Sequence, residues 1–244
     1  MDVTGFLGVV FSRRSVRRYV RASIPSEHLS LIMEAGRRAP TDATLQLWTS
    51  IRVSDFGLRE RIAGALGQKH VLEASEFFVF IADLYRPSRL LEFRGYRLGD
   101  VEELLLLLAA VDAALAAENM VLAAQALGYG SCFIGGIHNI AGSIIEWLGL
   151  PEKTYPLFGL TIGIPAENPP ERPRLPLDML FHENRYREYV EGDLAKAYNS
   201  MEFQSWGDWL RVLRKYVAQG GVFEVRNREF LELARRQRLL IHVD

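Results

Sequence analysis

The longest apolar segment of the chain runs from Leu104 to Gly128 and predicts a single long helix. Leucine and alanine dominate it, both residues favour helices, and no proline follows before Pro151. Its few polar residues recur at heptad spacing, Asp112 with Asn119 and Glu118 with Gln125. Each pair therefore lies on one stripe and leaves the remaining circumference apolar. The pattern predicts a helix buried nearly all round.

A membrane span is the alternative for such a segment, because about 20 apolar residues suffice to cross a bilayer. However, Asp112 and Glu118 fall inside it, and an acidic residue near the bilayer centre costs about 2.5 to 3.5 kcal/mol on insertion scales. We therefore interpret the segment as the core helix of a soluble protein. Gly128 is a typical helix end, and 131–134 predicts a short buried strand. It leads to Gly135-Gly136, where the backbone can approach something flat or charged.

Shorter periodic segments predict the remaining elements. An N-cap at Ser26 and another at Asp55 would begin two helices. Beyond Phe181 the chain turns to charged helical segments with too little core of their own, which should pack on the main body or on a partner subunit. The predicted helices are 4–11, 26–38, 55–66 and 144–149, with 206–217 and 226–240 in the tail. The predicted strands are 48–53, 77–82 and 157–164, and 83–99 is expected to be an irregular excursion or lid.

Composition narrows the class of protein. The chain has 244 residues, of which 49% are hydrophobic, enough for one large domain with no visible linker. A net charge of -1 gives no electrostatic footprint for nucleic acid or for anionic membranes. The single cysteine, Cys132, excludes an internal disulfide and suits a reducing compartment. No signal peptide pattern is visible, so we expect a cytoplasmic protein.

Two arginine-rich segments are candidates for an anion site. Five arginines occupy nine positions between Arg13 and Arg21, which indicates either a solvated basic face, a nucleic-acid arm, or a phosphate site with a serine hydroxyl beside guanidinium groups. The proline-dense stretch 165–176 carries a second pair, Arg172 and Arg174, spaced so that both can point the same way.

The usual side-chain catalysts are missing from the sequence. No HExxH, Walker loop or GxSxG motif occurs, and Gly128 to Gly136 lacks the GxGxxG spacing of a dinucleotide fold. The five histidines show no ligand spacing, so we predict that they are surface or structural residues and that no metal is bound. Cys132 is expected to serve packing. The pattern suits an enzyme whose chemistry is carried by a cofactor.

A set of motifs between residue 12 and about residue 190 together resembles the FMN-dependent nitroreductase family, and most closely its NADPH-using group A nitroreductases and flavin reductases. The motifs are Arg14-Ser15-x-Arg17, Ala39-Pro40-Thr41 to Gln46, Gly67-Gln68-Lys69-His70, Phe133-Ile134-Gly135-Gly136, Pro156 to Leu160, Arg172-Pro173-Arg174-Leu175-Pro176 and His182-Glu183-Asn184. The resemblance implies an α+β fold, with a central, mostly antiparallel sheet flanked by helices, in an intertwined homodimer that holds FMN at the subunit interface. Residues 1–190 would form the FMN-binding domain and 191–244 a helical extension of the same domain.

The resemblance also assigns roles to residues. Arg13, Arg14 and Ser15 would bind the FMN phosphate and ribityl chain together with Arg172 and Arg174. Arg17 would lie by the N1 and C2 carbonyl edge of the isoalloxazine and stabilise the reduced flavin, while backbone NH groups near Gly135 would face N5. The full cofactor-binding set is Arg13, Arg14, Ser15, Arg17, Thr41, Ala43, Gln46, Gln68, Phe133, Ile134, Gly135, Gly136, Arg172 and Arg174, with Thr41, Ala43 and Gln46 supplied by the partner subunit.

The activity implied by the resemblance is a ping-pong, two-electron reduction of nitroaromatics, quinones or free flavin at the expense of NAD(P)H. A non-catalytic flavin-binding or redox-regulatory protein is the alternative. The arginine-bearing loop that the group uses for the NADPH 2′-phosphate should fall near 198–205, where this chain is shorter and has no arginine. Both NADPH and NADH therefore remain candidate donors, and the sequence does not identify the physiological acceptor.

Overall fold

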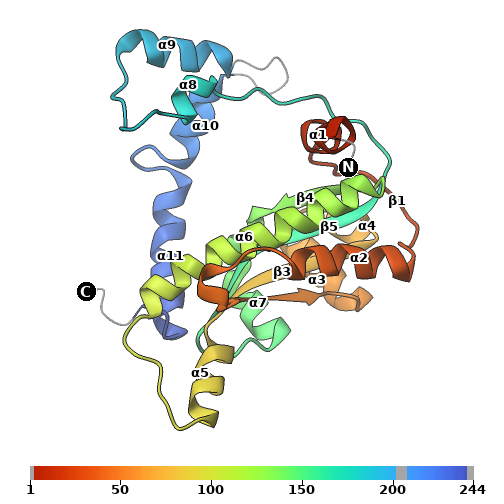
Figure 1. The fold of residues 1–244 in the computed structure, drawn as a ribbon, viewed down its shortest axis with the longest axis vertical. Coiled ribbons are helices and arrows are strands. Elements are labelled where there is room, and N and C mark those ends of the chain that lie inside the picture. Colours follow the sequence, from red (N-terminus) through yellow and green to blue (C-terminus); the bar gives the residue numbers. More distant parts are fainter. Residues whose placement is uncertain (1–2, 202–207, 241–244) are drawn as a thin grey trace. The chain divides into compact units, whose positions relative to one another are not determined.

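The computed structural model describes residues 3–201 and 208–240, and the chain divides into two compact units (Figure 1). The first unit comprises the residues up to 169 and those from 230 onward, and the second comprises 170–229. The predicted α+β class is confirmed, since helices surround one sheet in the first unit. Of the predicted tail segments, 206–217 has its first two residues outside the described residues, and 226–240 ends at the last described residue.

The sheet of the first unit is built around its longest strand, β5 (Thr154–Pro165). β5 pairs antiparallel with β1, β3 and β4, and β3 pairs antiparallel with β2. The other strands are β1 (Tyr19–Val20), β2 (Trp48–Arg52), β3 (Glu76–Asp83) and β4 (Gly130–Ile134). All four strand segments expected from the sequence are present, and the pairing is antiparallel throughout these strands, as predicted.

Both faces of the sheet are covered by helices because β3 is apolar on both sides. Phe78 and Phe80 pack into one core cluster with α2 (Ser26–Arg37) and α6 (Glu102–Ala126). Phe77, Val79 and Ile81 pack into a second cluster with α3 (Phe56–Leu66), α7 (Ala141–Leu148) and the 3₁₀ turn η2 (Gly135–Ile140). A continuous apolar run of strand length is typical of a strand buried on both faces, and Figure 1 shows the resulting three layers.

The long helix α6 differs from the expectation of burial all round. Leu104, Leu107, Val111 and Leu115 are 57%, 62%, 49% and 41% exposed and form one face, while the opposite face packs on α2 and β3. Within the described residues α6 alone has the length and composition of a membrane span. Its acidic Asp112 is nonetheless buried against the protein's own backbone, so its inner face belongs to the protein core.

Two local expectations were wrong. The stretch 83–99 is not wholly irregular, because Tyr85–Phe93 form the helix α5. Ser26 is the first residue of α2 rather than its N-cap, and Pro25 stands at the cap position without a side-chain bond. The cap at Asp55 is confirmed, since its side chain accepts a hydrogen bond of 2.7 Å from the Leu58 backbone N–H. The first unit also contains α1 (Val3–Ser12), η1 (Asp42–Thr44) and α4 (His70–Glu73).

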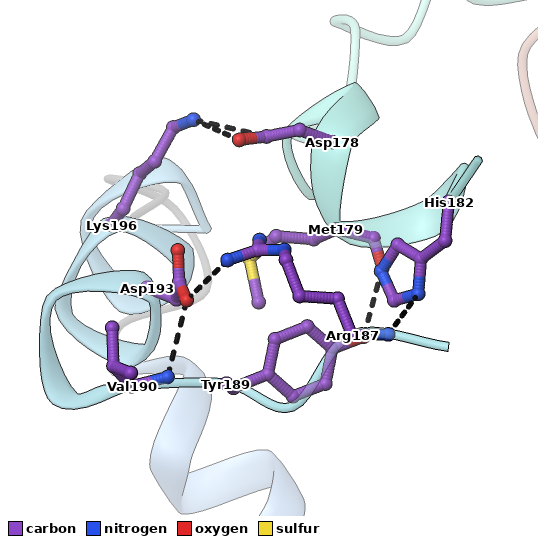
Figure 2. A network of polar contacts seen from close by, with 8 residues as sticks. All are labelled: Asp178, Met179, His182, Arg187, Tyr189, Val190, Asp193 and Lys196. Atoms are coloured by element: carbon purple, nitrogen blue, oxygen red, sulfur yellow. Dashed lines mark hydrogen bonds and ion pairs between the residues drawn. The ribbon is translucent and has the colours of Figure 1, made fainter. Parts of the chain in front are cut away.

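The second unit consists of short helices held by polar contacts, with few buried side chains. Figure 2 shows Asp193 accepting hydrogen bonds from the Val190 backbone N–H at 3.1 Å and from the Arg187 guanidinium at 2.7 Å. The Arg187 guanidinium lowers the pKa of the Asp193 carboxyl. Lys196 and Asp178 form a second ion pair with a distance of 2.8 Å. The helices are α8 (Leu177–Leu180), α9 (Glu191–Ser200), α10 (Trp209–Tyr216) and the first turns of α11 (Val222–Arg236).

Candidate active site

Arg17 is held in place by the pairing of its neighbours with strand β4. The Val16 backbone N–H donates to the Ser131 carbonyl at 2.9 Å, and Ser15 forms an isolated parallel bridge with Ser131. Val16 can lie this close because residue 130 is glycine: a Cβ there would come within 2.7 Å of a Val16 methyl group. The segment that carries the first arginines is therefore attached to the sheet.

A buried tyrosine joins the same segment to strand β5. The Tyr19 hydroxyl lies 2.7 Å from the Val16 carbonyl and 3.0 Å from Thr161 Oγ1 on β5. Burial raises the pKa of Tyr19 well above its ordinary value, so the phenol stays protonated and keeps donating. Glu167 accepts a hydrogen bond of 2.5 Å from the Arg17 backbone N–H. These backbone and side-chain hydrogen bonds fix the backbone at Arg17 and so the direction in which its side chain leaves the backbone.

The turn that carries Gln68 lies between helices α3 and α4, which a buried arginine joins. Arg59 on α3 donates from Nε to the Val71 carbonyl at 2.8 Å and from its other nitrogens to the Ser75 and Ala74 carbonyls. These carbonyls end the short helix α4, where backbone acceptors lack helical partners. Arg59 therefore fixes the chain just after the polar residues of the turn by joining α3 to the end of α4.

These elements meet at one cavity of about 490 Å³. Arg17 comes from the N-terminal segment, Gln68 from the α3–α4 turn and Gly135 from the end of β4. The cavity joins five of the sequence-predicted residues, and its full lining is Arg17, Gly67, Gln68, Lys69, His70, Glu73, Cys132, Phe133, Ile134 and Gly135. Residues far apart in the sequence therefore form a single site, and none of the lining residues belongs to 83–99.

Five of the lining residues were not predicted as site residues, and His70 is the most informative of them. His70 Nε2 is buried and has no hydrogen-bond partner among the residues that the structure describes. Burial lowers the pKa of the His70 imidazole, and the neighbouring Arg17 lowers it further, so the ring is neutral at pH 7. The only sequence signal was its position two residues after Gln68 within Gly67-Gln68-Lys69-His70.

Two polar groups of the cavity, the Arg17 guanidinium and His70 Nε2, have few or no partners among the described residues and could bond to a polar ligand. Within the described chain, Arg17 forms no ion pair, and its guanidinium makes only one weak hydrogen bond, of 3.4 Å, to the Ser15 carbonyl. An unpaired buried group such as His70 Nε2 costs free energy unless a ligand or water satisfies it. A flat ligand with several hydrogen-bonding atoms and a developing negative charge fits this wall, and the pyrimidine end of a flavin has those properties.

The two glycines at the end of β4 act differently. A Cβ added at Gly136 would lie 3.1 Å from the Gln68 side-chain nitrogen and 3.2 Å from Leu66, so glycine lets the Gln68 amide pack over the turn. A Cβ added at Gly135 would meet no heavy atom within 4 Å. Since Gly135 lines the cavity, its backbone is open to a ligand that approaches closely.

The other residues expected to bind phosphate in the first unit lie outside this cavity lining. Arg14 donates to the Phe11 carbonyl at 2.7 Å and to the Arg13 carbonyl at 2.9 Å. Arg13 Nε lies 4.0 Å from Glu118 on α6, the long range of an ion pair. Ser15 faces β4 through its backbone. The structure thus keeps Arg13, Arg14 and Ser15 next to Arg17 in the chain, and their role toward phosphate stays a prediction.

The loop 41–46 also lies outside the cavity lining, and its role in the partner subunit's site stays a prediction. Arg172 and Arg174 belong to the second unit, where Arg174 donates to the Pro173 carbonyl at 2.9 Å. The expected position of an NADPH-binding loop, 198–205, lies partly in 202–207, outside the described residues. No group of three or more histidine, cysteine, aspartate or glutamate side chains that could hold a metal occurs in the described parts of the chain.

Comparison with known proteins gives concordant matches. Residues 10–164 match a family model described as the nitroreductase family. The chain is 40% identical over 184 residues to an oxygen-insensitive NADPH nitroreductase of Salmonella typhimurium, covering 75% of each chain. It is 36% identical over 180 residues to an FMN reductase (NADPH) of Bacillus subtilis, covering 72% of each. Among solved structures, an NADPH:FMN oxidoreductase from Vibrio harveyi complexed with NAD⁺ matches with a TM-score of 0.78 and 33% identity, over 86% of this chain and 89% of that one.

Proposed function

The chain belongs to the nitroreductase family, and we propose that it is an FMN-dependent oxidoreductase that uses NADPH or NADH to reduce nitroaromatics, quinones or free flavin. The observation that carries the proposal is the cavity in which Arg17, Gln68 and Gly135 meet beside His70, whose Nε2 has no hydrogen-bond partner among the described residues. The relatives that share this chain's sequence are named as NADPH nitroreductase and FMN reductase, which supports both an FMN cofactor and a nicotinamide donor.

FMN, when bound, supplies the reversible two-electron chemistry that no side chain of this cavity can perform. Arg17 would place a positive charge beside the edge of the ring that becomes negative on reduction, and a preorganised charge of this kind would favour reduction of the flavin. The Gln68 amide has donors and an acceptor for the pyrimidine edge. Backbone N–H groups near Gly135 and Gly136 would face N5, and the open space at Gly135 would let the ring approach the main chain closely.

We place the remaining FMN contacts on residues outside the cavity lining. Arg13, Arg14, Ser15, Arg172 and Arg174 would bind the phosphate, because a dianion favours several guanidinium groups at once. The FMN-binding region therefore extends over residues 1–190, beyond the end of the first compact unit at residue 169. Residues 191–244 would be an extension that packs on the body or on the partner.

The same function calls for a second copy of the chain. The loop residues Thr41, Ala43 and Gln46 would complete the site of the partner subunit, and the exposed apolar face of α6 (Leu104, Leu107, Val111 and Leu115) has the composition of an interface core. The apolar, partly exposed α1 contacts α6 and would join the same surface. The substrates are small molecules, and the single cysteine and a nicotinamide donor suit the cytoplasm.

The experiment that tests this function is anaerobic reduction of the purified protein. We expect a yellow protein whose flavin absorbance is lost on adding NADPH or NADH and restored by a nitrofuran or a quinone. Initial rates with the two donors, measured side by side, decide the preference that residues 198–205 leave open. Parallel lines in double-reciprocal plots would support ping-pong order, in which the oxidised nicotinamide leaves before the acceptor enters.

The outcomes separate the competing functions. A colourless protein that takes up no added FMN contradicts the proposal. A yellow protein whose flavin neither donor reduces favours a non-catalytic flavin-binding or regulatory role instead.

A further inference from the structure

The loop 41–46 is held in a backbone conformation that its residues disfavour. Ala43, Thr44 and Gln46 have φ values of 43°, 57° and 52°, and none of them is glycine. For a β-branched residue such as Thr44 this left-handed conformation is a strong outlier. Conformations of this kind persist only where the surrounding structure over-determines them, and they cluster at functional sites. The contacts that hold this loop are therefore informative.

One side of the loop is held by a buried carboxylate. Asp112 on α6 is 1% exposed, and its two oxygens accept hydrogen bonds from the backbone N–H groups of Asp42 at 3.0 Å and Leu47 at 3.2 Å. One carboxylate thus joins both ends of the loop. A charged acceptor bonded to two backbone donors is a strong and directional contact.

The other side is held by an arginine of the excursion helix α5. Arg86 donates through one guanidinium nitrogen to the carbonyls of both Gln46 and Trp48, the latter at 2.9 Å. Arg86 is itself fixed by Asp83, which accepts from the Arg86 backbone N–H at 2.9 Å. Asp112 on α6 therefore binds backbone N–H groups at both ends of the loop, and Arg86 on α5 binds backbone carbonyls at its C-terminal end.

We propose that Asp112 and Arg86 are positioning residues that preorganise the loop 41–46 for its contact with FMN in the partner subunit's site. The proposal rests on the proposed function, which gives the loop that role. It explains why Asp112 occupies the buried face of a largely apolar helix, and why the excursion 83–99 contains a helix that lines no part of the cavity. Neither residue touches the cofactor; both act through the loop backbone.

The first test measures FMN binding to the apo-protein, by quenching of flavin fluorescence, in the full-length chain. Asp112→Asn replaces one acceptor oxygen with an amide that faces a backbone donor, and Arg86→Met removes the carbonyl contacts. We expect each to raise the FMN dissociation constant by about tenfold or more, since hydrogen bonds to charged groups are involved. Arg89→Met is the matched control on the same helix, because Arg89 is exposed and, among the residues that the structure describes, forms an ion pair only with Glu92. The FMN affinity of this variant should equal that of the wild type.

A second measurement separates positioning from general damage. Asparagine tolerates the left-handed region better than threonine. With Thr44→Asn the loop should therefore depend less on its hydrogen bonds to Asp112 and Arg86. We expect Asp112→Asn to weaken FMN binding several-fold less in the Thr44→Asn background than in the wild type. Equal losses in both backgrounds, or wild-type affinity in both Asp112→Asn and Arg86→Met, would overturn the proposal.

Hydrogen exchange distinguishes failure of this proposal from failure of the proposed function. The amides of Asp42 and Leu47 should be protected in the wild type and exchange faster in Asp112→Asn, with or without FMN. If the wild type takes up no FMN, the proposed function is wrong, and the proposed role of Asp112 and Arg86 in FMN binding is wrong with it. If FMN binds normally to Asp112→Asn while these amides exchange faster, the function stands and the positioning role is wrong.

Discussion

Gly135 is the residue for which geometry and proposed role can be compared most directly. It lines the cavity, and a Cβ at this position would meet no protein atom within 4 Å. The protein itself therefore has no packing reason to require glycine here. A requirement for glycine would have to come from the ligand.

We predict that Gly135→Ala folds normally and loses FMN affinity by at least about tenfold, or about 1.4 kcal/mol. The added methyl group would occupy space that the cofactor needs beside the β4 backbone. Fluorescence titration of the apo-protein gives the dissociation constant, and thermal unfolding shows whether the fold is intact.

Gly64→Ala on α3 is the matched control, because a Cβ there also meets nothing within 4 Å. Alanine should preserve or slightly raise stability in this helix, by about 0.5 to 1 kcal/mol, and leave FMN affinity unchanged. Equal affinity in Gly135→Ala and Gly64→Ala would show that the cofactor does not approach residue 135.

His70 gives a prediction about pH. Burial and Arg17 lower its pKa in the folded state, while Glu73 and Glu167 act in the opposite direction. Because the unfolded chain takes up the proton first, at about pH 6.5, the stability contribution of the neutral ring is complete above that pH and is lost as the pH falls toward the lower folded pKa. We expect His70→Gln to flatten the fall in unfolding free energy below pH 6.5, measured by urea denaturation at a series of pH values. The same slope in variant and wild type would contradict the assignment.

Among the elements, α6 combines opposite requirements in one helix. Its inner face approaches α2 closely, since a Cβ at Gly36 would lie 2.8 Å from the Met120 side chain, and Asn119 donates to the Ala35 carbonyl at 3.1 Å. Its polar residues Asp112 and Asn119 thus bond to backbone of the same chain. Its outer apolar face is exposed in the single chain, and under the proposed function a second copy covers it.

We predict that Leu107→Lys shifts the protein from dimer to monomer and weakens FMN binding with it, because a charge would enter the apolar centre of the proposed interface. Sedimentation velocity over a range of concentrations measures the association. Leu90→Lys on α5 is a matched control: both leucines are 62% exposed, and only Leu107 lies on the α6 face. An unchanged dimer in Leu107→Lys would place the interface elsewhere.

At the scale of the whole molecule, features that depend on residues close in sequence were predicted well, and features that depend on contacts between distant residues were not. The strand at Phe77–Ala82 and the helix stops at Gly128 and Gly149 were predicted closely, because alternation, apolar runs and left-handed glycines are local signals. The helix α5 was missed, since its stretch is polar and weakly periodic. The tail was recognised as helical. The boundary between the two compact units after residue 169 depends on which residues contact each other in the folded chain.

The sequence by itself determined the apolar strands and the long central helix and, through its resemblance to a family, the class of fold and most of the residues proposed to bind FMN. Only the tertiary structure brought Arg17, Gln68 and Gly135 into one cavity, added His70 to it, and turned Asp112 and Arg86 into partners of the loop 41–46. Local patterns record which face of a strand or helix is buried. Which distant residues then meet depends on strand pairing and on the close packing of helices, which no local pattern encodes.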